Sequence, residues 1–155
     1  MSDTIVYDGG TEADRRRLLE LHAAYLTANA TFDVPALRKL WSKDPSAVFF
    51  NLNGHTYVGV EQWTRLWEYY GARLQTGLWT PSDIKVMVRG DMAMITCHRL
   101  SPVKWVGPED EPRTYQANPR RHSRSTMVFA REDGDWRVVH THFSEASTDP
   151  RPGGI

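Results

Sequence analysis

The chain has 155 residues, of which 40% are hydrophobic and 25% charged. These proportions exclude a disordered, fibrous or collagen-like chain and predict one globular domain over residues 1–155, with an ordered core of about residues 10–147. Lysine plus arginine and aspartate plus glutamate both number 19, so the net charge is zero. This balance excludes the basic excess typical of proteins that bind nucleic acids or anionic membranes.

Cysteine content and hydropathy indicate a compartment. Cys97 is the only cysteine, so the chain cannot form an internal disulfide or a cysteine-based zinc site. The first residues lack the apolar stretch of a signal peptide, and nowhere do about 18 apolar residues follow one another. We therefore expect a cytoplasmic protein without a membrane-spanning segment.

The first half of the chain carries helical patterns. After an arm over residues 1–10, Thr11 and Asp14 give a capping signal, and apolar residues then recur at spacings of three and four. This predicts a first helix with Tyr25 on its buried face. Asp33 begins a shorter second helix, and residues 60–74 predict a third. Residues 47–52 predict a short strand between the second and third helices.

The second half reads as strands. Residues 84–88 and 92–100 predict one hairpin, and residues 122–131 and 136–144 predict another, joined by the turn residues 132–135. Four prolines make residues 102–119 a long irregular connection, and we expect the tail 147–155 to be disordered. Helices followed by antiparallel strands predict an α+β fold with a small-molecule pocket between the sheet and the helices.

The last hairpin, RxTxV at residues 124–128 and REDGDWRVVHTHFS at residues 131–144, resembles the nuclear transport factor 2-like (NTF2-like) superfamily. Within it, the chain is most similar to the SnoaL-like branch, which also includes ketosteroid isomerase and the association domain of calcium/calmodulin-dependent kinase. The resemblance implies a cone-shaped fold, in which a curved antiparallel sheet wraps around three N-terminal helices, and a homodimer. Isomerase-like members carry a base carboxylate after the first strand, whereas this chain has Phe50-Asn51-Leu52-Asn53 there.

The last strand carries the first catalytic candidates. Side chains alternate along a strand, so His140, His142 and Ser144 are predicted to share one face with Trp136 and Val138. The resemblance implies that this face lines the pocket, where histidines act as general acids or bases near neutral pH. A purely structural role for His140, as a hydrogen-bonded core histidine, stays open.

The preceding strand presents His122, Arg124 and Thr126 at a period of two. A one-residue bulge at the Asp133-Gly134 turn would bring this face opposite His140 and His142, as the resemblance favours. A tight two-residue turn would instead bring Ser123, Ser125 and Met127 opposite them. In the bulged arrangement Arg124 could hold a carboxylate, a phenolate or an oxyanion; otherwise it is an exposed charge.

Further candidates lie on the helices and on the first hairpin. The resemblance implies that Tyr25 donates to a substrate oxygen, although a core tyrosine fits the pattern equally. Together the candidates form two sets. The expected catalytic residues are His142, His140, Arg124, Tyr25 and His98. The expected substrate-binding residues are Trp63, Trp67, Phe50, Asn51, Tyr70, His122, Thr126 and Ser144, with Trp41 also in the apolar wall.

Cofactor signals are absent from the sequence. It has no phosphate-binding glycine loop and no dinucleotide fingerprint. Three imidazoles could bind zinc if His140 and His142 met His98 or His122, but no acid lies on the predicted inner faces to support them. We therefore expect neither a metal nor another cofactor.

These observations predict a cofactor-independent lyase or isomerase that acts by acid–base catalysis. Seventeen aromatic residues favour a small, apolar, aromatic substrate. Among the activities of the superfamily that the chain resembles, a lyase that removes water or formaldehyde from a lignin-derived diaryl compound suits such a pocket. The alternative is a non-catalytic oligomerisation or ligand-sensing domain. A resemblance to metal-independent carbonic anhydrases is a third reading, which the aromatic content disfavours.

Overall fold

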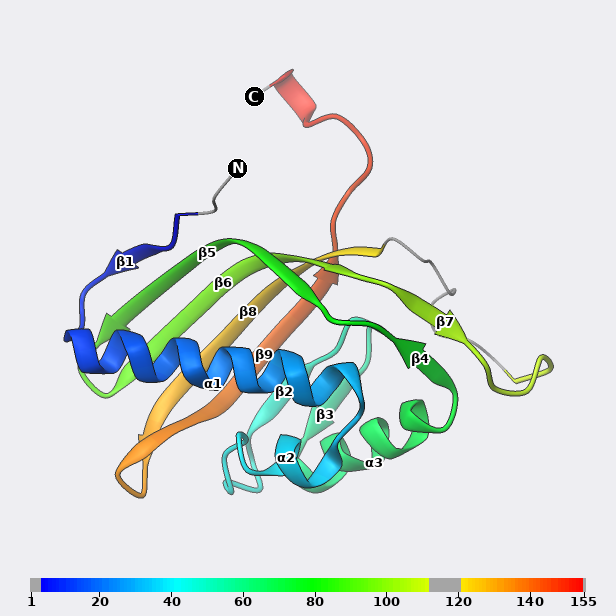
Figure 1. Ribbon diagram of the computed structural model, residues 1–155, viewed down its shortest axis with the longest axis horizontal. Helices are drawn as coiled ribbons and strands as arrows, with labels where there is room; N and C mark the ends of the chain where they lie inside the picture. The colour runs from blue at the N-terminus through cyan, green and yellow to red at the C-terminus, as the bar shows by residue number, and fades with distance from the viewer. Residues whose placement is uncertain (1–3, 112–120, 155) are drawn as a thin grey trace.

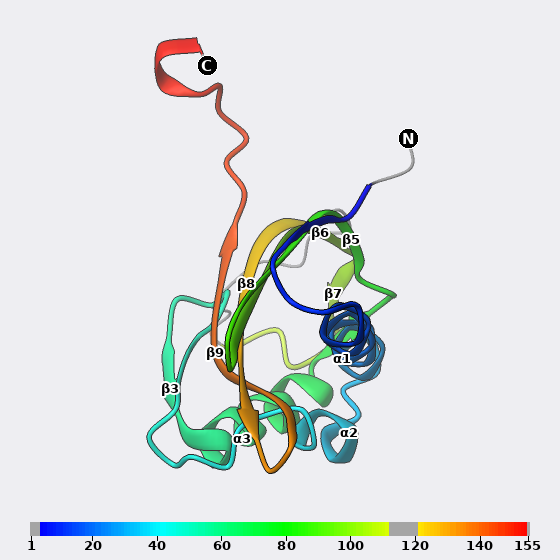
Figure 2. The same ribbon diagram turned by 90° about the vertical axis from the view of Figure 1, so that its left-hand side faces the viewer.

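The computed structural model describes residues 4–111 and 121–154. Within these residues, seven strands form one curved sheet in the order β1-β5-β6-β8-β9-β2-β3, and the three α-helices lie on its concave side (Figures 1 and 2). The four long strands are antiparallel neighbours: β5 (Thr80–Arg89), β6 (Met92–Ser101), β8 (Arg121–Glu132) and β9 (Asp135–Glu145). The α+β prediction is confirmed. The sheet is mixed rather than purely antiparallel, because β1 runs parallel to β5 and β2 parallel to β9.

Helix α1 (Glu12–Ala30) begins where the sequence predicts. The Thr11 side chain accepts a hydrogen bond from the backbone N–H of Asp14, and the Asp14 carboxylate accepts one from the backbone N–H of Thr11. This capping box satisfies two N–H groups that the helix itself leaves unpaired. Helix α2 (Val34–Arg38) is likewise capped by Asp33, as predicted.

Helix α3 (Gly59–Gly71) buries the aromatic residues Trp63, Trp67 and Tyr70. Gly59 has a φ of +75°, and a Cβ atom there would lie 2.9 Å from the carbonyl oxygen of Pro45. Only glycine fits this position, so the residue fixes where the helix starts. The helix ends at Gly71, three residues before the predicted end at Leu74.

Several short strands complete the fold. Strand β2 (Val48–Phe50) lies within the predicted strand over residues 47–52, and it pairs antiparallel with β3 (Thr56–Val58). Strand β1 (Val6–Asp8) lies within the predicted arm, and β4 (Leu74–Thr76) pairs with β7 (Val103–Trp105) in a separate two-stranded sheet. The predicted connection over 102–119 therefore starts with a strand, and its residues 112–119 lie outside the described residues.

The hairpin between β8 and β9 contains the irregularity that matters most for the site. Asp133 and Gly134 both have positive φ, 53° and 80°, as a tight two-residue turn of the hairpin type requires. The predicted bulge at this turn is therefore wrong. The bulge lies further along β9, where Phe129 pairs with Val138 but Val128 pairs with His140, so Val139 is the extra residue.

This bulge reverses the alternation of side chains along β9. Trp136 and Val138 are buried before it, and Thr141 and Phe143 are buried after it. The prediction that His140, His142 and Ser144 share a face with Trp136 and Val138 is therefore wrong. One extra residue is enough to move every following side chain to the opposite face of the sheet.

The core lies between the concave face and the helices. Trp41, Phe49 and Trp63 form its centre, with ring centroids 5.1–5.5 Å apart. Within the described residues, every helix is too short or too polar to cross a membrane.

Candidate functional site

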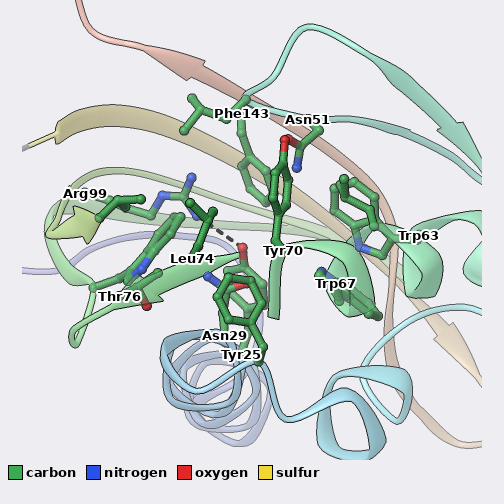
Figure 3. Close-up of a pocket in the computed structure, with 15 residues that line it drawn as sticks. Tyr25, Asn29, Asn51, Trp63, Trp67, Tyr70, Leu74, Thr76, Arg99 and Phe143 are labelled. Carbon is green, nitrogen blue, oxygen red and sulfur yellow. Dashed lines mark hydrogen bonds between the residues drawn. The ribbon is translucent and has the colours of Figure 1, made fainter. Parts of the chain in front are cut away.

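A small cavity lies between the concave face of the sheet and helices α1 and α3 (Figure 3). Its volume is about 30 Å³, which is enough for roughly two water molecules. A larger ligand therefore requires lining side chains to move. The aromatic lining consists of Tyr25, Phe32, Trp63, Trp67, Tyr70, Trp79 and Phe143, and the polar lining of Asn29, Asn51, Thr76 and Arg99.

Five of the predicted site residues line this cavity. Tyr25 reaches it from α1, and Trp63, Trp67 and Tyr70 reach it from α3. Asn51, which directly follows β2, is the fifth. The helical spacing therefore predicted correctly which aromatic residues face inward.

The other predicted residues lie outside the cavity. Thr126 pairs with His142 and Arg124 pairs with Ser144, where the Arg124 Nε donates to the Ser144 hydroxyl at 3.2 Å. The structure thus brings these predicted side chains together, as the bulged register required. They meet on the convex face of the sheet, opposite the cavity, because the bulge lies at Val139.

Four remaining candidates also point away from the cavity. His140 is half-buried, and its Nδ1 donates to the backbone carbonyl of Val48 at 2.6 Å, which is a structural role. The Nδ1 of His98 lies 2.9 Å from a carboxylate oxygen of the exposed Asp83. His122 is exposed, and Phe50 is 38% exposed, whereas its neighbour Phe49 is in the core.

Some of these outer residues border a shallow second pocket of about 310 Å³ at the edge of the sheet. Phe50, Asn51, His142, Ser144 and Glu145 are among its lining residues. Among the described residues, no three His, Cys, Asp or Glu side chains lie close enough together to hold a metal ion. The three-imidazole arrangement is therefore not formed there.

The residue that sequence reasoning missed is Arg99. It lies on β6 between Cys97 and Ser101 on the concave face, and only 1% of its surface is exposed. Its Nη1 donates to the Tyr25 hydroxyl and its Nε to the Ser123 hydroxyl, both at 3.2 Å. The available signal was the alternation in residues 92–101, which puts Arg99 on one face with the apolar residues Ala93, Ile95 and Cys97.

Two aromatic rings hold the Arg99 guanidinium in place. Its Cζ lies 4.5 Å from the ring centroid of Trp79 and 4.3 Å from that of Phe143. Stacking against ring faces is a favourable environment for a guanidinium. Figure 3 shows this group entering from the sheet, with the hydrogen bond to Tyr25 on α1 drawn as a dashed line.

Burial and the Arg99 charge also set the protonation states nearby. Burial raises the pKa of the Tyr25 phenol, and the Arg99 charge offsets only part of this effect. Burial, and then repulsion from Arg99, lowers the pKa of His22 to about 4. Burial likewise raises the pKa of the Cys97 thiol, whose sulfur is 3.8 Å from the His22 Nε2. At neutral pH the side chains of Tyr25, His22 and Cys97 are therefore uncharged, and Arg99 is the charged residue beside them.

A curved sheet around N-terminal helices, with an aromatic cavity on its concave side, is the NTF2-like fold. The family model for the SnoaL-like domain matches residues 18–148, and the chain belongs to that family. Among curated proteins, none matches the sequence.

Solved structures share the fold. An NTF2-like superfamily protein from Salmonella enterica serovar Typhimurium is 19% identical, with a TM-score of 0.75, and the match covers 93% of this chain and 99% of that one. A protein of the NTF2-like family from Streptomyces avermitilis, named as a candidate dehydratase, is 18% identical, with a TM-score of 0.70 and coverage of 88% and 99%. A protein from Novosphingobium aromaticivorans, named as a candidate aromatic ring hydroxylase, is 17% identical, with a TM-score of 0.70 and coverage of 90% and 93%.

Proposed function

We propose that this protein is a cofactor-independent lyase or isomerase that takes a small, largely apolar, aromatic substrate into the cavity beside Arg99. The aromatic lining and the small number of polar groups are typical of such a pocket. One structural neighbour is named as a candidate dehydratase and another as a candidate aromatic ring hydroxylase, and both names support this class of reaction and substrate.

The pairing of Tyr25 with Arg99 is the observation that carries this proposal. The Tyr25 oxygen accepts a hydrogen bond from the guanidinium, so the phenolic proton is left to donate to another group. Because burial raises the phenol pKa, Tyr25 keeps this proton at neutral pH and can act as a general acid. The guanidinium stabilises the phenolate that forms when the proton leaves.

This pair can perform a complete elimination. Tyr25 gives its proton to the departing hydroxyl group, which leaves as water with the electrons of the C–O bond. The phenolate then takes a proton from the adjacent carbon, and the C–H electrons form the new double bond. The acid is regenerated, and both proton transfers occur on the same side of the substrate. An isomerisation would instead give a proton to one carbon and remove a proton from another, which moves the double bond without a leaving group.

The proposal is tested by screening the purified protein for ligands and then for turnover. Aromatic alcohols, diaryl ethers, phenolic acids and steroids are first ranked by the increase that they cause in the melting temperature, with and without a chelator. The stabilising compounds are then assayed for loss of water or formaldehyde and for double-bond migration. We expect turnover that is insensitive to chelator.

Two substitutions locate the site. Tyr25→Phe should lower kcat by about 100-fold or more, since that is the lower range for loss of a general acid. His142→Ala, on the convex face, should leave kcat unchanged. Loss of activity in His142→Ala but not in Tyr25→Phe would contradict the proposal. Binding without turnover of any compound would instead indicate the alternative, a non-catalytic ligand-binding domain.

A further inference from the structure

Arg99 differs from the arginines that form ion pairs among the described residues. Five of those arginines are partly exposed, and each has a carboxylate oxygen within 2.6–3.0 Å; these are Arg17, Arg38, Arg73, Arg89 and Arg131. Arg99 is almost fully buried, and its hydrogen-bond partners are the neutral hydroxyl groups of Tyr25 and Ser123. Among the described residues, the cation therefore lies inside the protein without a paired anion.

Within residues 4–111 and 121–154, one edge of this guanidinium has no hydrogen-bond partner. Its Nη2 is buried and makes no hydrogen bond, while Arg99 lines the cavity. A buried donor that is left unpaired destabilises the protein, and it does so more strongly when it carries charge. The neighbouring Trp79, against whose ring the guanidinium stacks, also has an unpaired buried N–H. The cavity thus offers donors and positive charge, and its lining contains no acidic side chain in the part of the chain that the structure describes.

We propose that the free edge of Arg99 binds a carboxylate, so that the ligand of this cavity is a small aromatic carboxylic acid in its ionised form. This inference rests on the proposed function and names its substrate class. A carboxylate on Nη2 would pair the buried charge while leaving Nη1 on the Tyr25 hydroxyl. The aromatic part of the ligand would then lie against the rings that line the cavity.

The experiment compares benzoate with benzamide, which has the same ring and nearly the same shape but no charge. Calorimetric titration of the full chain should give an affinity for benzoate at least about tenfold higher, because hydrogen bonds to ionised groups are substantially stronger than neutral ones. Equal affinities, a preference for benzamide, or no binding of benzoate would overturn the inference. This comparison needs no variant.

Two variants then test the residue. Arg99→Met keeps the length of the side chain but removes the charge, and we expect it to fold, since an apolar side chain avoids the cost of a buried, unpaired charge. The Arg99→Met substitution should abolish the preference for benzoate over benzamide. Arg124→Met, the matched control on the convex face, should bind benzoate as the unaltered protein does. An unchanged preference for benzoate in Arg99→Met would overturn the assignment.

The proposed function and this inference can fail separately. If neutral aromatic alcohols are turned over in a Tyr25-dependent way and benzoate does not bind, the carboxylate is wrong and the enzyme stands. If benzoate binds through Arg99 and no compound is turned over, the carboxylate site stands and the enzyme does not.

Discussion

The guanidinium of Arg99 on β6 and the hydroxyl of Tyr25 on α1 form a hydrogen bond of 3.2 Å across the interior of the protein. Both residues are buried, with exposed fractions of 1% and 3%. This contact connects the first helix to the centre of the sheet. It gains strength because water is excluded from the interior. It also orients the phenolic group at the cavity.

A double-mutant cycle measures this contact. We expect Tyr25→Phe and Arg99→Met to be non-additive by about 1–3 kcal/mol in the free energy of unfolding, since residues in one buried network couple by that amount. Urea denaturation of the two single variants and the double variant gives the coupling energy. Additivity within about 0.5 kcal/mol would show that the contact contributes nothing to stability.

His22 should make the protein less stable in mild acid. Its pKa is about 4 in the folded protein and about 6.5 in the unfolded chain. Protonation therefore favours unfolding: this contribution is fully present above pH 6.5 and is lost as the pH falls from about 6.5 to 4. The total is about 3 kcal/mol.

The measurement compares His22→Leu with the unaltered protein. Urea unfolding at several pH values gives the difference between the two proteins, which removes the contribution of carboxylates such as Asp135 that titrate in both. A difference that stays constant between pH 7 and 4 would show that His22 accepts a proton in the folded protein as easily as in the unfolded chain.

Deletion of Val139 should disrupt the core. Without the extra residue, Trp136 and Val138 cannot face inward together with Thr141 and Phe143. At least two large apolar side chains would leave the core, at a cost of about 3 kcal/mol or more. Val139→Ala, which keeps the bulge, should cost less than about 1 kcal/mol. Similar denaturation midpoints for both variants would mean that the bulge does not determine the facing of β9.

The sequence predicted those elements that have local signals. Thr11 and Asp14 gave the start of α1, and the Asp133-Gly134 pair gave the last hairpin, because capping and tight turns depend on neighbouring residues. Strands β1, β4 and β7 have three residues each and are held by partners that are distant in the sequence. Their formation depends on the assembled fold, so no local pattern indicates them.

The candidate site was predicted on the helices and at Asn51, but not on the long strands. Helical spacing assigned Tyr25, Trp63 and Trp67 to the interior correctly. On the sheet, unbroken alternation along β9 assigned His140 and His142 to the cavity, and the bulge at Val139 places both on the opposite face. The bulge occurs where Val138 exchanges backbone hydrogen bonds with Leu40 and Ser42, a contact between segments about a hundred residues apart. The predicted homodimer and cytoplasmic location stay predictions.

An NMR titration that follows the indole N–H resonances of the tryptophans tests most directly whether the ligand binds in the cavity. The titrant is the aromatic compound that raises the melting temperature most. Trp63 and Trp79 line the cavity with unpaired N–H groups, whereas Trp136 is buried outside it and serves as the internal control. We predict that the Trp63 and Trp79 resonances shift on binding and that the Trp136 resonance does not. Unchanged Trp63 and Trp79 resonances at ligand concentrations that raise the melting temperature would contradict the assignment of the cavity as the functional site.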